Sequence, residues 1–267
     1  MSRLTSHDSR PTTRSRLDAA LVKRGLAETR ERAHALILNG TVRVDGATAT
    51  RPAQAVPDEA DIAVEHKAPG YVSRGALKLE AALDYWHINP EGHVALDVGA
   101  STGGFTDLLL SRGATRVYAV DVGHGQLHYK LRGDPRVVVM ERTNVRNLGS
   151  LPEQADLAVV DVSFISLRLA LPPVFALDPK TLVALIKPQF EAGRGLVRKG
   201  VVRDPAIHRG VLQDLRDWST SRSWRLHDLL KSPIRGPAGN VEFLSRWQAG
   251  GPVVDDARIE QVLELAR

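Results

Sequence analysis

The sequence predicts an α/β protein in which a small N-terminal α+β domain precedes a larger domain built on a doubly wound, mainly parallel sheet. Short apolar runs alternate with helical patterns from about residue 72 onward, as in βαβ units. A glycine-rich loop follows the first of these runs. Residues 1–56 contain 10 Lys and Arg against 5 Asp and Glu, whereas residues 57–267 contain 26 of each. The whole net charge of +5 therefore belongs to the N-terminal segment.

The composition excludes several classes of protein. The 267 residues are enough to bury a sizeable core, and the absence of cysteine excludes disulfides, cysteine-ligated zinc and thiol nucleophiles. No apolar run reaches the length of about 18 residues that a membrane-spanning helix needs, and the first residues lack the apolar stretch of a secretory signal. We therefore expect a cytoplasmic protein. Its basic segment is typical of RNA or DNA binding, and a poorly ordered basic tail is the alternative.

The N-terminal domain is predicted to begin with two short helices. Residues 1–15 are polar and rich in Ser, Thr and Arg, so we expect a disordered tail there and a folded domain over residues 16–66. The first helix has apolar residues at helical spacing and ends before Gly25, which suits the C′ position. Thr29 is a good N-cap for the second helix, which Asn39–Gly40 ends.

A small sheet is predicted after these helices. Val42–Val44 alternates apolar and polar residues, and the following Asp45–Gly46 is a strong signal for a two-residue hairpin turn. Asp61–Val64 is a third short strand.

The segment RLDAALVKRGLAETRERAHALILNGTVRVDG resembles the S4 RNA-binding domain, and the resemblance covers roughly residues 14–66. In that family, basic side chains of the two helices face structured RNA. Several cations on one rigid face can neutralise phosphates and read the shape of an RNA; a solvated helix face is the alternative. By this resemblance the phosphate-binding candidates are Arg16, Lys23, Arg24, Arg30, Arg32 and Arg43.

The larger domain is predicted over residues 72–267, after a linker at residues 67–71 that contains Pro69–Gly70. Its strands and helices alternate, and the last two strands are joined by a turn, which is compatible with an antiparallel pair at the end of a parallel sheet. The predicted strands are Val94–Val98, Val117–Asp121, Val137–Met140, Leu157–Asp161, Leu182–Lys187, Leu226–Lys231 and Val241–Trp247, and the predicted helices include Ser101–Arg112 and Asp204–Arg222.

The loop in ALDVGASTGGFTD is suited to a ligand. Gly99, Gly103 and Gly104 permit a tight turn and a close approach of the backbone to a ligand at the carboxyl edge of the sheet. Asp121 ends the next strand, where a carboxylate can accept both hydroxyls of a ribose. The spacing GxxxGG matches neither the dinucleotide-binding G-x-G-x-x-G nor the Walker A motif. Purely structural turns are the alternative.

The motif DVGASTGGFTD resembles motif I of S-adenosylmethionine-dependent methyltransferases, and especially that of the FtsJ-like 2′-O-methyltransferases. The resemblance implies S-adenosylmethionine as the cofactor. It places the methionine part beside Asp97, the ribose on Asp121 and the adenine near Asn144. The full set of cofactor-binding candidates is Asp97, Gly99, Ala100, Ser101, Gly103, Gly104, Phe105, Asp121, Val122, Asn144, Val145 and Asp161.

Four charged residues fall at the ends of apolar segments, where charge is rare unless it is paired or functional. These residues are Lys78, Asp161, Lys187 and Glu242. In a doubly wound sheet the strand ends converge beside the glycine loop, so we expect a network of alternating charge there. Structural salt bridges are the alternative.

The same four residues are similar to the Lys–Asp–Lys–Glu catalytic tetrad of the FtsJ-like family. Lys187 is the candidate base for a ribose 2′-hydroxyl, and Lys78 the neighbouring charge that stabilises the developing alkoxide. A neighbouring ammonium and partial burial favour a neutral lysine, whereas the carboxylates of Asp161 and Glu242 oppose it. The sequence leaves open which effect is larger. We expect no metal, because the nine histidines form no HExxH motif, and His124 and His128 lack an acidic third ligand.

The succession of the S4-like module, VSRGALKL, DVGASTGGFTD, DVSFISL and KPQFEAGR resembles the TlyA family, also labelled haemolysin A, over about residues 14–250. The resemblance implies 2′-O-methylation of cytidine in 16S or 23S ribosomal RNA, or in both, with ribosomal subunits as partners. Because the larger domain is neutral overall, its RNA contacts are expected from local basic residues, namely Arg74, Arg194, Arg198 and Lys199.

Alternative functions remain at this stage. A non-catalytic RNA-binding or ribosome-assembly protein would leave the four charged residues without a purpose. A membrane-acting haemolysin is disfavoured by the lack of a signal, of an apolar span and of a strongly amphipathic basic helix. A nicotinamide-dependent dehydrogenase is disfavoured by the glycine spacing. The modified nucleotide, the choice of ribosomal subunit and the oligomeric state are left open.

Overall fold

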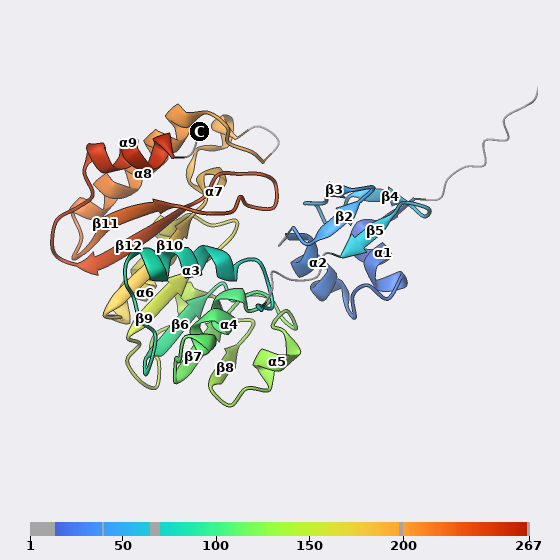
Figure 1. Cartoon of the computed structure of the whole chain (residues 1–267), viewed down its shortest axis with the longest axis horizontal. Helices are drawn as coiled ribbons and strands as arrows, with labels where there is room; N and C mark the ends of the chain where they lie inside the picture. The colour runs from blue at the N-terminus through green and yellow to red at the C-terminus, as the bar shows by residue number, and fades with distance from the viewer. Residues whose placement is uncertain (1–13, 39, 65–69, 198–199, 266–267) are drawn as a thin grey trace, which may run out of the picture. The chain divides into compact units, whose positions relative to one another are not determined.

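The computed structural model describes residues 14–38, 40–64, 70–197 and 200–265. The chain divides into two compact units, Met1–Glu65 and His66–Arg267 (Figure 1). Each unit has a hydrophobic core of its own.

The first unit packs two helices on short strands. Its helices are α1 (Leu17–Lys23) and α2 (Arg30–Leu38), and its strands are β1 (Arg14–Arg16), β2 (Val42–Val44), β3 (Ala47–Thr48), β4 (Ala55–Pro57) and β5 (Ile62–Val64). Strand β2 pairs with β3 and β5 in one antiparallel sheet, and β1 pairs with β4 in a second. Leu17, Leu21 and Ile37 are fully buried and hold the helices against the strands.

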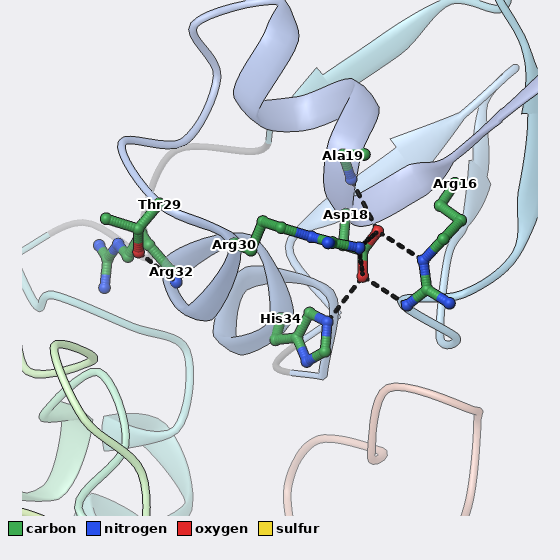
Figure 2. Close-up of polar contacts among 7 residues, drawn as sticks. All are labelled: Arg16, Asp18, Ala19, Thr29, Arg30, Arg32 and His34. Carbon is green, nitrogen blue, oxygen red and sulfur yellow. Dashed lines mark hydrogen bonds and ion pairs between the residues drawn. The ribbon is translucent and has the colours of Figure 1, made fainter.

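Three local predictions for this unit are confirmed. The backbone N–H of Arg32 donates to Thr29 Oγ1 at 3.1 Å, so Thr29 caps α2 (Figure 2). Gly25 has φ +69° just after α1, as the C′ position requires. Asp45 and Gly46 both have positive φ and join β2 to β3, which is the geometry of a type I′ hairpin turn.

The expected extent of the N-terminal tail is wrong at its end. Arg14 and Ser15 belong to β1, which pairs with β4 in register Arg14↔Pro57. A strand of three polar residues is too short to show an alternating pattern in the sequence, so only its pairing with β4 reveals it. Residues 1–13, and Asn39 at the end of α2, lie outside the described residues.

The second unit contains the predicted doubly wound sheet. Its strands lie in the order β11-β12-β10-β9-β6-β7-β8. The five strands from β10 to β8 are parallel, whereas β12 runs antiparallel to both β10 and β11. Their bounds are β6 (Val94–Val98), β7 (Arg116–Val120), β8 (Val137–Met140), β9 (Leu157–Val160), β10 (Thr181–Ile186), β11 (Trp224–Lys231) and β12 (Phe243–Ala249).

Helices cover both faces of this sheet (Figure 1). On β6, Ala95 faces the core formed with α3, α4 and the segment of α5, whereas Leu96 and Val98 face the core formed with α6, α8 and α9. This alternation is the period of two that a strand requires. The bounds are α3 (Ala76–Tyr85), α4 (Gly104–Ser111), α5 (Tyr129–Arg132), α6 (Leu167–Ala176), α7 (Pro188–Glu191), α8 (Pro205–Thr220) and α9 (Asp256–Glu264), with short 3₁₀ turns at η1 (Val145–Asn147) and η2 (Arg194–Leu196).

The element bounds differ from the predicted ones where the chain meets the site. The helix expected from Ser101 begins at Gly104, because Ser101 and Gly103 have φ +49° and +95° and form a left-handed turn. Strands β7, β9 and β10 end one residue before Asp121, Asp161 and Lys187. The charged residues therefore stand just beyond the strands, in the position from which side chains of an open α/β sheet reach a ligand.

The strand order fixes where a ligand would bind. From the central strand β6 the chain continues to β7 and β8 on one side, and it then returns to β9 and β10 on the other. The carboxyl ends of β6 and β9 consequently form the switch point of the sheet, which is the usual binding crevice of this fold class.

Candidate active site at the carboxyl edge of the sheet

Two ion pairs of alternating charge lie at this edge. Lys78, from α3, donates from Nζ to Oε2 of Glu242 at 2.6 Å. Lys187 Nζ lies 2.6 Å from Asp161 Oδ1 and donates to Ser163 Oγ at 2.9 Å. Lys78, Lys187 and Glu242 are buried, and Asp161 retains a partly exposed side chain. The four residues singled out in the sequence are thus brought together in pairs.

The two pairs influence one another electrostatically. Burial alone favours a neutral Lys78, but the carboxylates of Glu242 and Asp161 outweigh it and hold the pKa of Lys78 above its ordinary value. Burial likewise favours a protonated Asp161, but Lys187 and Lys78 outweigh it and hold the pKa of Asp161 below its ordinary value. The two carboxylates therefore keep the side chain of Lys78 protonated.

The glycine loop packs against the residue that carries one of these charges, Asp161. Gly99 has φ +85°, and a Cβ atom placed on it would lie 2.4 Å from the backbone oxygen of Asp161. Any side chain at position 99 would push the loop away from the end of β9. The glycine therefore holds the loop after β6 against the strand end that carries Asp161.

Asp97 is a buried carboxyl group beside the loop. Its Oδ2 accepts a hydrogen bond from Thr106 Oγ1 of α4 at 2.6 Å, whereas its Oδ1 has no hydrogen-bond partner among the described residues. Burial raises the pKa of Asp97 to about 7; the bond from Thr106 only partly offsets this rise, to which the nearby carboxylates of Asp161 and Asp121 also contribute. An unpartnered carboxylate oxygen at this position is suited to a cationic group of a ligand.

Two backbone N–H groups orient the carboxylate of Asp121. Its Oδ2 accepts the N–H of Ser101 at 2.8 Å, and its Oδ1 accepts the N–H of Gly123 at 2.7 Å. Each carboxylate oxygen keeps a further lone pair with which it can accept a hydroxyl. Val122, the next residue, is 70% exposed and offers an apolar surface beside it.

The remaining cofactor-binding candidates differ in what they present. Ala100, Phe105 and Val145 are buried in the hydrophobic cores, so their side chains support the loops from behind. Asn144 uses its side-chain oxygen to accept the N–H of Arg146 at 3.0 Å. A Cβ at Gly103 would lie 2.2 Å from a terminal carbon of Leu131, and one at Gly104 would lie 2.2 Å from the hydroxyl of Ser73, so a side chain at either position would force these neighbours to move.

The basic candidates of this unit are only partly described. Arg74 is exposed, and its charge acts on Lys78, so it lies within electrostatic reach of the charged group. Arg194 has a described backbone in η2, whereas its side chain, together with Arg198 and Lys199, lies outside the described residues.

The basic candidates of the first unit fall into different environments. Arg16 and Arg30 both bind the buried carboxylate of Asp18 (Figure 2). Arg24 donates to the backbone oxygens of Asp58 and Ala60 at 2.6 and 2.7 Å, so it ties α1 to the loop before β5. The other three are Lys23, which is exposed and 3.7 Å from Asp58, and the half-buried Arg32 and Arg43.

Phe164 is a candidate that the sequence analysis does not single out. It lies three residues beyond Asp161, has φ +65°, and is 73% exposed, with its ring centroid 5.0 Å from that of Phe190. A bulky residue held in the left-handed region, with its ring exposed, is typical of a functional loop. In the sequence Phe164 stands in the segment DVSFISL beside other apolar residues, which does not distinguish it from a core residue.

The described residues contain no group of three or more His, Asp or Glu side chains placed to hold a metal ion. Near α5, His124 Nδ1 lies 3.1 Å from Glu141 Oε2. No helix in the described part of the chain is long and apolar enough to span a membrane.

Comparison with known families identifies both units. The sequence profile described as FtsJ-like methyltransferase matches residues 71–248, and that of the S4 domain matches residues 15–62.

Similar proteins cover most of the chain. The 16S/23S rRNA (cytidine-2′-O)-methyltransferase TlyA of Mycobacterium tuberculosis is 48% identical over 237 residues, which are 86% of this chain and 88% of that protein. Hemolysin A of Brachyspira hyodysenteriae is 41% identical over 238 residues, 87% of this chain and 99% of that protein. A solved structure from Streptococcus thermophilus, provisionally described as a hemolysin, has a TM-score of 0.72 and 39% identity and covers 96% of both chains.

Proposed function

The chain belongs to the FtsJ-like methyltransferase family, and we propose that it methylates the 2′-hydroxyl of cytidine in ribosomal RNA with S-adenosylmethionine as the donor. The observation that carries this proposal is the pair of contacts Lys78–Glu242 and Lys187–Asp161 beside the glycine loop. The M. tuberculosis relative, which is named for the same reaction, supports the choice of substrate.

The residues around the glycine loop fit the cofactor. Oδ1 of Asp97 is buried and has no hydrogen-bond partner in the part of the chain that the structure describes, which suits the ammonium group of the methionine part. Asp121 offers carboxylate lone pairs to the ribose hydroxyls, and Val122 an apolar surface to the adenine. When bound, S-adenosylmethionine supplies a methyl group on a positively charged sulfur, which is already a strong electrophile.

The charged residues then have to position and deprotonate a weak nucleophile. In this proposal Lys187 accepts the proton of the 2′-hydroxyl, and the charged Lys78 stabilises the oxygen as negative charge develops on it. Asp161 and Glu242 orient the two lysines through the 2.6 Å contacts. Alignment of the reacting groups contributes a large part of the rate enhancement. Two reactants held side by side react as if they were parts of one molecule, so the entropy cost of bringing them together has already been met on binding.

The first unit supplies the RNA affinity in this proposal. We divide the chain into an RNA-binding domain at residues 16–66, a linker at 67–71 and a catalytic domain at 72–267. The S4 match and the concentration of positive charge in the first 56 residues support this division of roles. Ribosomal subunits in the cytoplasm would be the partners.

The test is methyl transfer from tritiated S-adenosylmethionine to separate small and large ribosomal subunits and to naked ribosomal RNA, with mapping of 2′-O-methyl sites. We expect label on cytidine ribose, and label on base nitrogens or carbons would overturn the proposal. Lys187→Ala should reduce transfer by about 10²–10⁴-fold while the dissociation constant for S-adenosylmethionine stays nearly constant.

Lys180→Ala is the matched control for this test. Lys180 precedes the same strand β10 at its opposite end and is 69% exposed in an ion pair with Asp156. Its loss should leave methyl transfer unchanged. Full activity of Lys187→Ala would contradict the assignment of Lys187 as the base.

A further inference from the structure

The carboxylate of Asp18 is fully buried in the first turn of α1 and is surrounded by donors (Figure 2). Arg16 donates to it from Nε at 3.1 Å and from Nη2 at 2.7 Å. Arg30 donates from Nη2 at 3.3 Å, and His34 Nε2 lies 2.7 Å from Oδ2. The backbone N–H of Ala19 completes the set at 2.7 Å.

The cations around Asp18 are exposed although the anion is not. Side-chain exposure is 50% for Arg16, 55% for Arg30 and 43% for His34, against 0% for Asp18. The Arg16 guanidinium outweighs the burial and, with His34, holds the pKa of Asp18 well below its usual range, so the carboxylate stays ionised. A buried anion thus lies beneath three side chains that reach solvent.

These contacts also constrain what each cation offers to a ligand. An ionised carboxylate only accepts hydrogen bonds, so Nε2 of His34 carries a proton and Nδ1 is its second ring nitrogen. Asp18 takes two of the five N–H donors of Arg16 and engages Arg30 through one nitrogen, Nη2. Even with His34 neutral, two guanidinium groups and one carboxylate give the cluster a net charge of +1.

We propose that Asp18 is a positioning residue that holds Arg16, Arg30 and His34 together as one phosphate-binding site for the RNA backbone. The proposal rests on the RNA-binding role proposed above for the first unit. It adds two residues, Asp18 and His34, that the sequence analysis does not assign, and it joins Arg16 and Arg30 in a single site.

Phosphate is the ligand that this geometry favours. Planar guanidinium forks match phosphate oxygens, and here they come from different elements, β1 and α2, with their directions fixed by a common anion. A long side chain that must be ordered on binding lowers affinity by about 2- to 12-fold. Asp18 has already ordered two such side chains. Arg24 contrasts with them, because its donors serve backbone oxygens of its own unit.

Replacing Asp18 separates this proposal from simple charge attraction. Asp18→Asn raises the net charge by one, so long-range electrostatics alone would tighten the binding of RNA. Loss of the common anion would instead free Arg16 and Arg30 and weaken binding. The two explanations predict changes of opposite sign.

The experiment measures the dissociation constants of the full chain for labelled transcripts of 16S and 23S ribosomal RNA over a range of salt concentrations. We expect Asp18→Asn to weaken binding of the better transcript by roughly tenfold. The matched control is Asp58→Asn, which removes a partly exposed acid of the same unit that lies 3.7 Å from Lys23. It adds the same charge and should leave affinity unchanged or tighter. Unchanged or tighter binding by a folded Asp18→Asn would overturn the proposal.

Further variants keep the test decisive if Asp18→Asn unfolds. Arg16→Gln, Arg30→Gln and His34→Gln alter side chains that are about half exposed, and each should weaken RNA binding several-fold. In a folded Asp18→Asn background, the effects of Arg16→Gln and Arg30→Gln should shrink. Unchanged affinity in all three single variants would overturn the proposal.

The kinetics distinguish positioning from a general loss of structure. Asp18→Asn should raise KM for ribosomal RNA, with kcat and the dissociation constant for S-adenosylmethionine unchanged. If the unmodified protein binds neither transcript in a salt-dependent way, the proposed function fails and this inference fails with it. If it binds and Asp18→Asn binds equally well, only the inference fails.

Discussion

Lys78 and Glu242 are 164 positions apart in the chain, and their side chains meet in a buried ion pair of 2.6 Å. Lys78 comes from the helix before the first strand of the sheet, and Glu242 stands immediately before β12. The pair therefore forms only when the whole sheet is assembled. Burial leaves each charge dependent on the other, because neither is solvated by water.

Glu242→Gln is expected to destabilise the protein. It leaves the ammonium of Lys78 in a buried place without its nearest carboxylate, which costs about 3 kcal/mol of unfolding free energy. Urea unfolding followed by circular dichroism measures this loss. The matched control is Asp217→Asn, which breaks an exposed pair with Arg216 and should cost less than about 1 kcal/mol. Equal small losses in both variants would contradict a structural contribution from the buried pair.

The raised pKa of Asp97 predicts that the free energy of unfolding decreases as pH rises. Its pKa is about 7 in the folded chain against an ordinary value of 3.8, so between these values the folded state binds more protons than the unfolded state. The contribution of Asp97 to stability is therefore fully present below about pH 3.8 and is lost as pH rises to about 7. Asp97→Asn should remove this part of the pH dependence, with a slope difference of up to about 1.4 kcal/mol per pH unit. The check is urea unfolding of both proteins at several pH values; identical slopes would contradict the assignment.

The same carboxyl group should make cofactor binding depend on pH. If Oδ1 of Asp97 receives the ammonium of S-adenosylmethionine, binding favours the ionised form, and affinity should rise with pH up to about 7 and then level off. Calorimetric titration at several pH values measures this dependence. Asp97→Asn should bind more weakly and lose the pH dependence, and its retention would assign the titration to another group.

Phe164 is expected to act on RNA rather than on stability. Its exposed ring stands three residues beyond Asp161, and stacking of a base on an aromatic ring contributes about 1–3 kcal/mol. Phe164→Ala should lower methyl transfer to ribosomal RNA by about tenfold or more, whereas Phe164→Tyr should retain activity. Tritium incorporation measures both. Leu169→Ala removes another exposed apolar side chain, on α6, and serves as the control; equal effects of the two alanine variants would contradict a specific role.

The alternation of strands and helices and the positions of the four charged residues were predictable because both leave a local pattern in the sequence. Buried parallel strands give short apolar runs, and a charge at the end of such a run is conspicuous, as for Asp161 and Lys187. The turn after β6 was located by its glycines. Its helix start was placed three residues early, because the left-handed φ of Ser101 leaves no mark in the sequence.

The sequence does not indicate which of the basic residues of the first unit share a partner. Arg16, Arg24 and Arg30 look alike in a basic segment, yet Arg24 binds backbone oxygens while the other two share the carboxylate of Asp18. Nothing local distinguishes them, since the choice is made by how β1, α1 and α2 pack. The pairing of β1 with β4 was missed for the same reason.

Deletion of residues 1–66 tests the division of labour between the two units. The cores of the second unit consist of its own residues, so the remaining chain should fold and bind S-adenosylmethionine with unchanged affinity. Its affinity for ribosomal RNA should fall, because the deletion removes residues 1–56, which contain 10 Lys and Arg against 5 Asp and Glu. Each lost phosphate contact should flatten the slope of log affinity against log salt by about 0.7–0.9. Filter binding over a salt series measures this slope, and calorimetry provides the cofactor control. A truncated protein with the same RNA affinity and the same slope would show that the basic segment does not bind the substrate.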